Sequence, residues 1–160
     1  MRPTLELRDS TVLKTFPEGS RAMCAREVLA YVEMPWATPA IQWNGALWLE
    51  MERCTPILDY PVSQSKQWAK PLRRLVERVN KAGWWHCDLS LVNVVVHPQR
   101  GPLLIDWEHL SPALSPVSYD LYGAQAAGVP PKHPKIPGDT GACWNALAQY
   151  SPRTVWGIEA

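Results

Sequence analysis

Apolar and polar residues alternate in much of residues 4–52, which is the pattern of strands that bury one face. Residues 4–16 (TLELRDSTVLKTF) alternate on both sides of a polar Asp9-Ser10 step, so we expect two strands and a tight turn. Residues 38–52 contain Asn44-Gly45, a strong hairpin signal, between two further apolar runs. This part of the chain is therefore predicted to form a small antiparallel sheet.

Two other stretches repeat their apolar residues at the three- and four-residue spacing of a helix. Residues 21–34 follow Ser20, an expected N-cap, and end before Pro35. Residues 66–81 lead to Gly83, a common helix stop, while Pro71 leaves the start of this helix open. The positions that carry the two predictions are Ala25, Val28, Leu29 and Val32 in the first helix and Trp68, Leu72, Leu75, Val76 and Val79 in the second.

A second hairpin is predicted by two apolar runs, VVVH and LLI, on either side of the turn sequence PQRGP in residues 94–105. A hairpin brings its outer ends together, so Asn93 and Asp106 are expected to be neighbours, with Asp88 in the loop before them. Carboxylate and amide oxygens are ligands that Mg²⁺ accepts. A further carboxylate can take a proton from an attacking hydroxyl. The three side chains together indicate phosphoryl transfer.

The run HCDLSLVN, followed after the hairpin by IDW, resembles the catalytic loop and the metal-binding motif of the protein-kinase-like superfamily. The resemblance implies an α+β, reduced two-lobed protein-kinase-like fold. Its N-lobe would be residues 1–54, a small antiparallel sheet with one helix. Its C-lobe would be residues 55–160, mainly helical, with the catalytic loop at 86–93 and the metal-binding motif at 106–108.

The same resemblance assigns roles to individual side chains. Asp88 would be the catalytic base and His86 would brace its loop, while Asn93 and Asp106 would hold Mg²⁺ against the nucleotide. Glu108 would assist a second metal ion. The alternative is that His86 and Asp88 cap a turn and Asn93 only begins a strand.

The N-lobe has counterparts of two further family residues. Lys14 in VLKT resembles the strand lysine that holds the α- and β-phosphates, and Glu27 would be the helix glutamate that orients it. The alternatives are a solvent-facing lysine on an edge strand and a solvated helix glutamate.

The chain departs from regulated protein kinases in several ways. No glycine precedes Gly19, so the family's glycine-rich phosphate loop is missing. The turn Asp9-Ser10-Thr11 would cover the phosphates instead, or the chain would be a degenerate kinase-like binding protein. Cys87 replaces the arginine of the HRD motif, and Asp120 follows Asp106 by only fourteen residues, with no APE motif.

The short spacing is similar to that of aminoglycoside, choline and lipopolysaccharide-sugar kinases, while atypical Ser/Thr kinases remain a second comparison. In that pattern Asp120 would brace the catalytic loop; the alternative is an ordinary N-cap. Residues 128–138 are proline-rich and would carry Lys132 and Lys135 toward an anionic acceptor or serve as a linker. A last short helix would follow Asp139 or Thr140 as far as Tyr150.

The composition of the chain limits its expected partners and location. The 160 residues are 46% hydrophobic and 19% charged, with a net charge of +1, which argues against bulk attraction to nucleic acid or anionic membranes. Four cysteines lack metal-site or disulfide spacing, and neither an apolar leader nor a membrane span is evident, so a cytoplasmic location is expected. The nine tryptophans are expected to pack in the core, the alternative being that one stacks on an aromatic ligand.

These observations predict a kinase that uses ATP and Mg²⁺ to phosphorylate a hydroxyl acceptor. The acceptor would be a small molecule such as a sugar, or a protein Ser/Thr. The alternative is a catalytically weak pseudoenzyme that acts by binding a partner protein.

Overall fold

The antiparallel sheet predicted for the N-terminal part of the chain is present in the computed structural model, which describes residues 2–128. Its strands are β1 (Thr4–Leu7), β2 (Thr11–Thr15), β3 (Ile41–Gln42) and β4 (Trp48–Glu52). They pair in the order β1-β2-β4-β3, with Lys14 of β2 opposite Leu5 of β1. Lys14 therefore lies on an inner strand, not on an exposed edge.

The hairpin around Asn44-Gly45 is wider than predicted. Gln42 pairs with Glu50, so the residues between them form a loop and not a two-residue turn. The β2–β4 pairing fixes the position of β4, and this long-range contact overrides the local turn preference.

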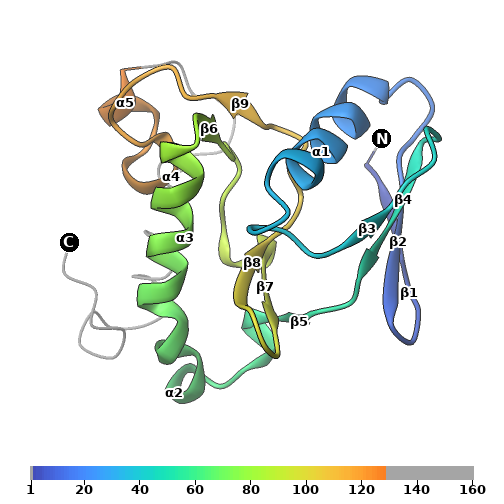
Figure 1. Cartoon of the computed structure of the whole chain (residues 1–160), viewed down its shortest axis with the longest axis horizontal. Helices are drawn as coiled ribbons and strands as arrows, with labels where there is room; N and C mark the ends of the chain where they lie inside the picture. Colours follow the sequence, from blue (N-terminus) through green and yellow to red (C-terminus); the bar gives the residue numbers. More distant parts are fainter. Residues whose placement is uncertain (1, 129–160) are drawn as a thin grey trace.

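Helix α1 (Arg21–Glu33) follows the first hairpin and lies beside the sheet (Figure 1). Its boundaries match the prediction, and Met34 and Pro35 follow its last turn. Ser20 is the N-cap residue of the helix, as predicted, but its side chain makes no capping hydrogen bond. Glu27 and Tyr31 lie one turn apart on the buried side of α1.

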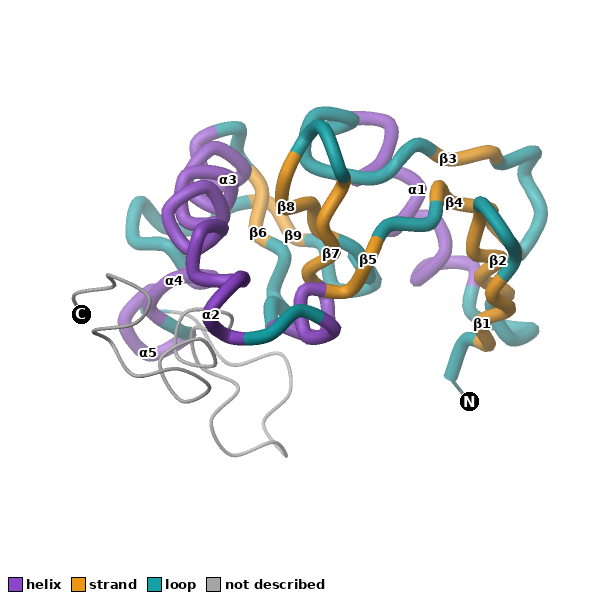
Figure 2. Tube along the Cα trace, turned by 90° about the horizontal axis from the view of Figure 1, so that it is seen from below, coloured by secondary structure: helices purple, strands orange, loops and turns teal. Residues whose placement is uncertain are grey.

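The rest of the described chain is a mixture of small sheets and helices. Strands β5 (Thr55–Pro56), β7 (Val94–His97) and β8 (Gly101–Leu104) form one antiparallel sheet, and β6 (Trp84–Trp85) pairs with β9 (Ser111–Pro112). The helices are α2 (Val62–Ser65), α3 (Ala69–Lys81), α4 (Tyr119–Tyr122) and α5 (Ala124–Ala127), with 3-10 turns at Ile57–Asp59, Lys66–Trp68 and Leu91–Asn93. Figure 2 shows α3, α4 and α5 at one end of the molecule and β1 to β4 at the other.

Helix α3 forms despite Pro71 because the proline is the third residue of the helix, where a backbone N–H has no partner within the helix. The helix ends at Lys81, and Gly83 follows with a φ of 97°, as predicted for a glycine after a helix. No helix among residues 2–128 combines the length and apolar character that crossing a bilayer requires.

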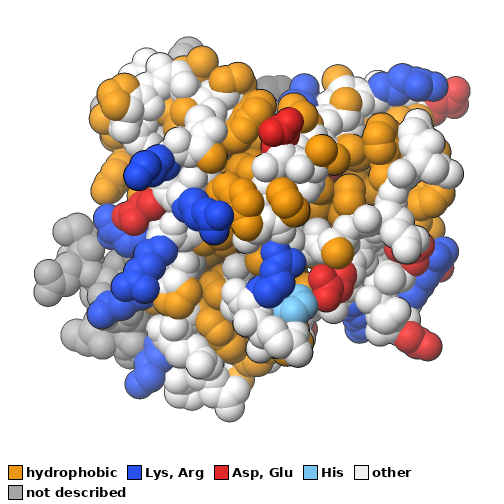
Figure 3. All heavy atoms as spheres, in the orientation of Figure 1, with side chains coloured by type: hydrophobic (Ala, Val, Ile, Leu, Met, Phe, Trp, Pro, Cys, Tyr) orange, Lys and Arg blue, Asp and Glu red, His pale blue; other side chains and the backbone are white. Residues whose placement is uncertain are grey.

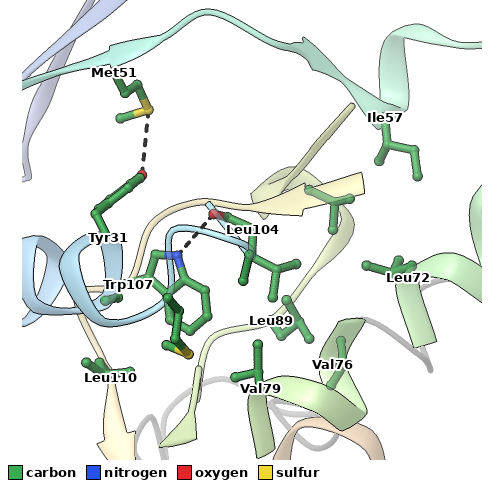
Figure 4. Close-up of a cluster of buried hydrophobic side chains, with 14 of the residues drawn as sticks. Tyr31, Met51, Ile57, Leu72, Val76, Val79, Leu89, Leu104, Trp107 and Leu110 are labelled. Carbon is green, nitrogen blue, oxygen red and sulfur yellow. Dashed lines mark hydrogen bonds between the residues drawn. The ribbon is translucent and has the colours of Figure 1, made fainter. Parts of the chain in front are cut away.

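One hydrophobic core joins the N-terminal sheet to the helical part. Leu49 of β4, Leu72 and Val76 of α3, Leu104 of β8 and Trp107 belong to the same buried cluster. Figure 4 shows Trp107 at its centre, where the indole Nε1 donates to the Leu104 carbonyl oxygen at 3.0 Å. Leu104 and Trp107, which flank Asp106 in the chain, are therefore fixed by packing in the core.

Candidate functional site

Lys14 lies at the centre of the site and forms ion pairs with three carboxylates. The residue is 4% exposed, and its ammonium nitrogen Nζ contacts three carboxylates, one from α1 and two from the segment after β8. It lies 2.7 Å from Oε2 of Glu27, 2.6 Å from Oδ1 of Asp106 and 3.0 Å from Oε1 of Glu108. We call Glu27, Asp106 and Glu108 the carboxylate cluster. Glu27 is fully buried, so neither it nor Lys14 is the solvated surface residue that the sequence left open.

The charges in this cluster do not balance. One ammonium faces three carboxylates, and burial raises the pKa of Glu27 to about 7 although Lys14 pulls it down. Burial also opposes the charge on Lys14, but attraction to Glu27 and Asp106 outweighs it and the pKa of Lys14 is raised. With all four groups ionised, the cluster carries a net charge of −2.

The hairpin predicted for residues 94–105 is confirmed as β7 and β8, and its outer ends meet. The N–H of Ile105 donates to the Asn93 carbonyl oxygen at 3.0 Å, which places Asn93 beside Asp106. The Asn93 side-chain Nδ2 donates to the Asp88 carbonyl oxygen at 2.8 Å. The amide nitrogen of Asn93 is thus used to hold the loop, and its oxygen is the atom suited to a cation.

Asp106 has a φ of 64°, a left-handed conformation that is rare outside glycine. This conformation lets the chain leave β8 so that Asp106 faces Lys14 while Trp107 turns into the core. Strained backbone of this kind persists where the surroundings determine it and is frequent at functional sites.

The loop that carries Asp88 is held from behind by Asp120. Both oxygens of the buried Asp120 carboxylate accept backbone hydrogen bonds, Oδ2 from the N–H of His86 at 3.0 Å and Oδ1 from the N–H of Cys87 at 2.9 Å. Asn80 of α3 donates to the same carboxylate at 2.7 Å. Like Asp106, Cys87 is a non-glycine residue with a left-handed backbone, at a φ of 67°. Asp120 is therefore not the N-cap of α4, a position held by Ser118.

His86 is fully buried and links this loop to the hairpin. Its ring nitrogen Nδ1 accepts from the N–H of Asp88 at 3.2 Å, and Nε2 lies 2.9 Å from the carbonyl oxygen of Ile105. The acceptor role of Nδ1 places the proton on Nε2, which donates to Ile105. His86 thus fixes Asp88 relative to the strand that leads to Asp106.

A cleft of about 780 Å³ opens between the N-terminal sheet and the hairpin. Lys14, Asp88, Asn93, Asp106 and Glu108 all border it. Its apolar walls come from Leu5, Leu7, Val12 and Met51 on one side and Val92, Val95 and Ile105 on the other. The volume and the mixture of apolar walls with a few convergent polar groups are typical of a small-molecule site.

The Asp9-Ser10-Thr11 turn, which was expected to cover the phosphates, does not line the cleft beside Lys14. The Arg53 N–H donates to the Ser10 carbonyl oxygen at 3.0 Å, and the Arg53 guanidinium donates to the Arg8 carbonyl oxygen at 2.8 Å. These bonds tie the turn to the segment after β4, while Lys14 lies nearer the other end of β2. The expectation that this turn replaces the glycine-rich loop is therefore wrong.

Sequence reasoning missed several supporting residues. Tyr31, whose hydroxyl lies 3.5 Å from Oε1 of Glu27, is four residues further along α1, and this helical spacing was a readable signal. Arg26 of the same helix donates to the Glu108 carbonyl oxygen at 2.5 Å, and Asn80 anchors Asp120; no sequence pattern pointed to either. Lys132, Lys135 and the predicted final helix lie outside the described residues. No protein-family model matches this chain, and no curated protein matches it either.

Proposed function

We propose that this protein is a phosphotransferase with a reduced protein-kinase-like fold, which moves the γ-phosphate of ATP to a hydroxyl acceptor. In this proposal β1 to β4 and α1 are the small lobe, and the chain crosses to the larger lobe between β4 and β5. The nucleotide would occupy the cleft between the apolar walls. Acceptors of two classes, a small molecule or a protein Ser/Thr, suit the proposal.

The observation that carries the proposal is the convergence on Lys14 of a carboxylate cluster drawn from α1 and from the end of the hairpin, in the cleft that Asp88 and Asn93 also border. The oxygens of Glu27, Asp106 and Glu108 lie within 4.8 Å of one another. Hard oxygen ligands and an excess of negative charge are what Mg²⁺ requires. The donor set therefore fits the ion.

Asp106, Glu108 and Asn93 would hold the ion, which when bound neutralises phosphate charge. Lys14 would contact the phosphates, and Glu27 would keep its ammonium directed into the cleft. Asp88 would orient the acceptor hydroxyl and accept its proton. The hydrogen bonds of His86 and Asn93 to its backbone hold Asp88 at the border of the cleft.

A second candidate function is partner binding by a kinase-like pseudoenzyme. Two observations favour it: no glycine precedes Gly19, and the β1–β2 turn is bound to Arg53 instead of lying over the cleft near Lys14. Without backbone amides around the phosphates, nucleotide affinity would be low.

The test is ATP binding by calorimetry, with and without Mg²⁺, on the parent, on Asp106→Asn and on a control carboxylate change, Glu33→Gln, at an exposed position of α1. We expect Mg²⁺-dependent binding that Asp106→Asn weakens by at least tenfold and Glu33→Gln leaves unchanged, because only Asp106 faces the cluster. Asp88→Asn is expected to bind ATP normally and to lose turnover. Absence of ATP binding by the folded parent would refute the kinase proposal in favour of the pseudoenzyme.

A further inference from the structure

Positive charge outside the cleft is concentrated on α3 and the turn before it. Residues 66–81 contain six of the sixteen lysines and arginines of the chain but a single acidic residue, Glu77. The segment therefore carries a net charge of +5, while the whole chain carries +1 and the remainder −4. We call these six residues the basic stripe: Lys66, Lys70, Arg73, Arg74, Arg78 and Lys81.

The basic stripe lies on one side of the helix. Leu72, Val76 and Val79 fill the opposite side and are buried in the core. Figure 3 shows Lys and Arg side chains gathered on one face of the molecule, at the side where Figure 1 places α3. From Lys70 to Lys81 the helix rises by roughly 16 Å at 1.5 Å per residue.

Internal contacts neutralise little of this charge. Arg73 pairs with Glu77 at 3.0 Å, and the Arg78 guanidinium lies 4.0 Å from the Trp36 ring centre, which holds the charge in place without cancelling it. Lys70 and Arg74 are exposed and form no ion pair within residues 2–128. A dense set of like charges that the contacts within residues 2–128 compensate only in small part is suited to an external polyanion.

We propose that the basic stripe is a docking surface for an anionic lipid bilayer. Clusters of four to eight basic residues on a helix bind acidic lipid headgroups, each contributing through the surface potential. Attraction to a bilayer requires basic side chains that are clustered and exposed, without a specific arrangement of hydrogen-bond donors. The apolar side of α3 is committed to the core, so the attachment is electrostatic, without insertion of the helix.

Nucleic acid is the less suitable polyanion for this surface. Single strands bind where several aromatic side chains stack on successive bases. Within residues 2–128, the exposed aromatic side chain that contacts α3 is Tyr122, whose hydroxyl accepts from Arg73. Entry into a duplex groove requires a protruding helix. Helix α3 is instead flanked by α4 through that same contact.

Docking through α3 would leave the cleft free. Figure 2 places α3 at the end of the molecule away from β1, whose residues Leu5 and Leu7 form one wall of the cleft. The surface would thus bring the cleft to acceptors concentrated at a membrane. This inference does not depend on the proposed function, because its test measures binding without nucleotide.

The test is sedimentation of the full chain with vesicles of phosphatidylcholine alone and with about 30% phosphatidylserine, at low and high salt. The test variant is Lys70→Gln/Arg74→Gln, which removes two charges from the stripe. The control is Arg21→Glu, which changes the net charge by the same amount at an exposed position of α1.

We expect the parent to bind phosphatidylserine vesicles only, with affinity that falls steeply with salt. The double variant should bind about 10- to 30-fold more weakly and the control should bind like the parent. Equal binding by the double variant and the parent would overturn the proposal, as would failure of the parent to bind. Tighter binding to single-stranded RNA or to polyglutamate than to the vesicles would overturn the choice of a bilayer as partner.

Discussion

Replacing Asp120 by alanine tests whether this carboxylate holds the loop that carries Asp88. Asp120 is 1% exposed, and its carboxylate accepts from two buried backbone N–H groups and from the Asn80 amide. Alanine removes every one of these acceptors at once. The two N–H groups belong to His86 and Cys87, which are themselves buried, so bulk water is not at hand to replace the lost acceptors.

The cost follows from the groups left without partners. Each buried N–H that loses its acceptor costs about 1–3 kcal/mol, so the two backbone donors together give about 4 kcal/mol. The bond from the Cys87 N–H to Asp120 also helps to hold the left-handed backbone of Cys87 in place. The loss is a large fraction of the roughly 5–15 kcal/mol by which domains of this size are stable. Asp120→Asn keeps one acceptor and is expected to cost about 2 kcal/mol.

Urea denaturation followed by tryptophan fluorescence measures these differences, and Trp85, next to the affected loop, reports on the transition. Glu33→Ala, at an exposed helix position, is the matched control and should stay within about 0.5 kcal/mol of the parent. A loss below about 1 kcal/mol in Asp120→Ala would refute the reasoning, because the loop would then be held by something other than this carboxylate.

Two further predictions concern titratable groups. Burial, and then the nearby Glu52 carboxylate, raise the pKa of the Cys54 thiol to about 11. Iodoacetamide at pH 8 should therefore alkylate Cys54 at least about 100-fold more slowly in the native protein than in the denatured chain. Peptide mass spectrometry measures the two rates, and equal rates would contradict the prediction. Burial raises the pKa of Glu27 from 4.5 to about 7, so between these pH values the folded protein keeps a proton that the unfolded chain has lost. The free energy of unfolding, measured without added metal, should therefore fall as the pH rises from about 5 to about 8. A Glu27→Gln variant with the same pH dependence would argue against Glu27 as its source.

The hairpin at the site was predictable because its signals are local. Two apolar runs and a turn rich in proline and glycine specify β7 and β8, and the closure of a hairpin then places Asn93 next to Asp106. Helices α1 and α3 were predictable for the same reason, since periodicity and flanking Pro35 and Gly83 mark their ends.

The contacts that complete the site depend on packing between distant parts of the chain. Asn80 and Asp120 are 40 residues apart, and no local pattern says that their side chains meet. The convergence of Glu108 with Asp106 on Lys14 likewise requires the hairpin and the N-terminal sheet to be docked first. The position of the β1–β2 turn was not predictable in the same way, because docking between distant parts of the chain decides which end of a hairpin faces a cleft.

Hydrogen bonds across the boundary between residues 54 and 55 bear on how the molecule unfolds. The Leu104 N–H donates to the Ala37 carbonyl oxygen at 2.8 Å, Arg100 donates to that of Thr38 at 3.1 Å, and the His97 ring contacts Glu52 at 2.9 Å. With one shared hydrophobic core, these links make the two parts a single cooperative unit. Residues 1–54 alone would lack the surface that buries their apolar face, so the small sheet and the hairpin are expected to exchange their amide hydrogens through one common opening event.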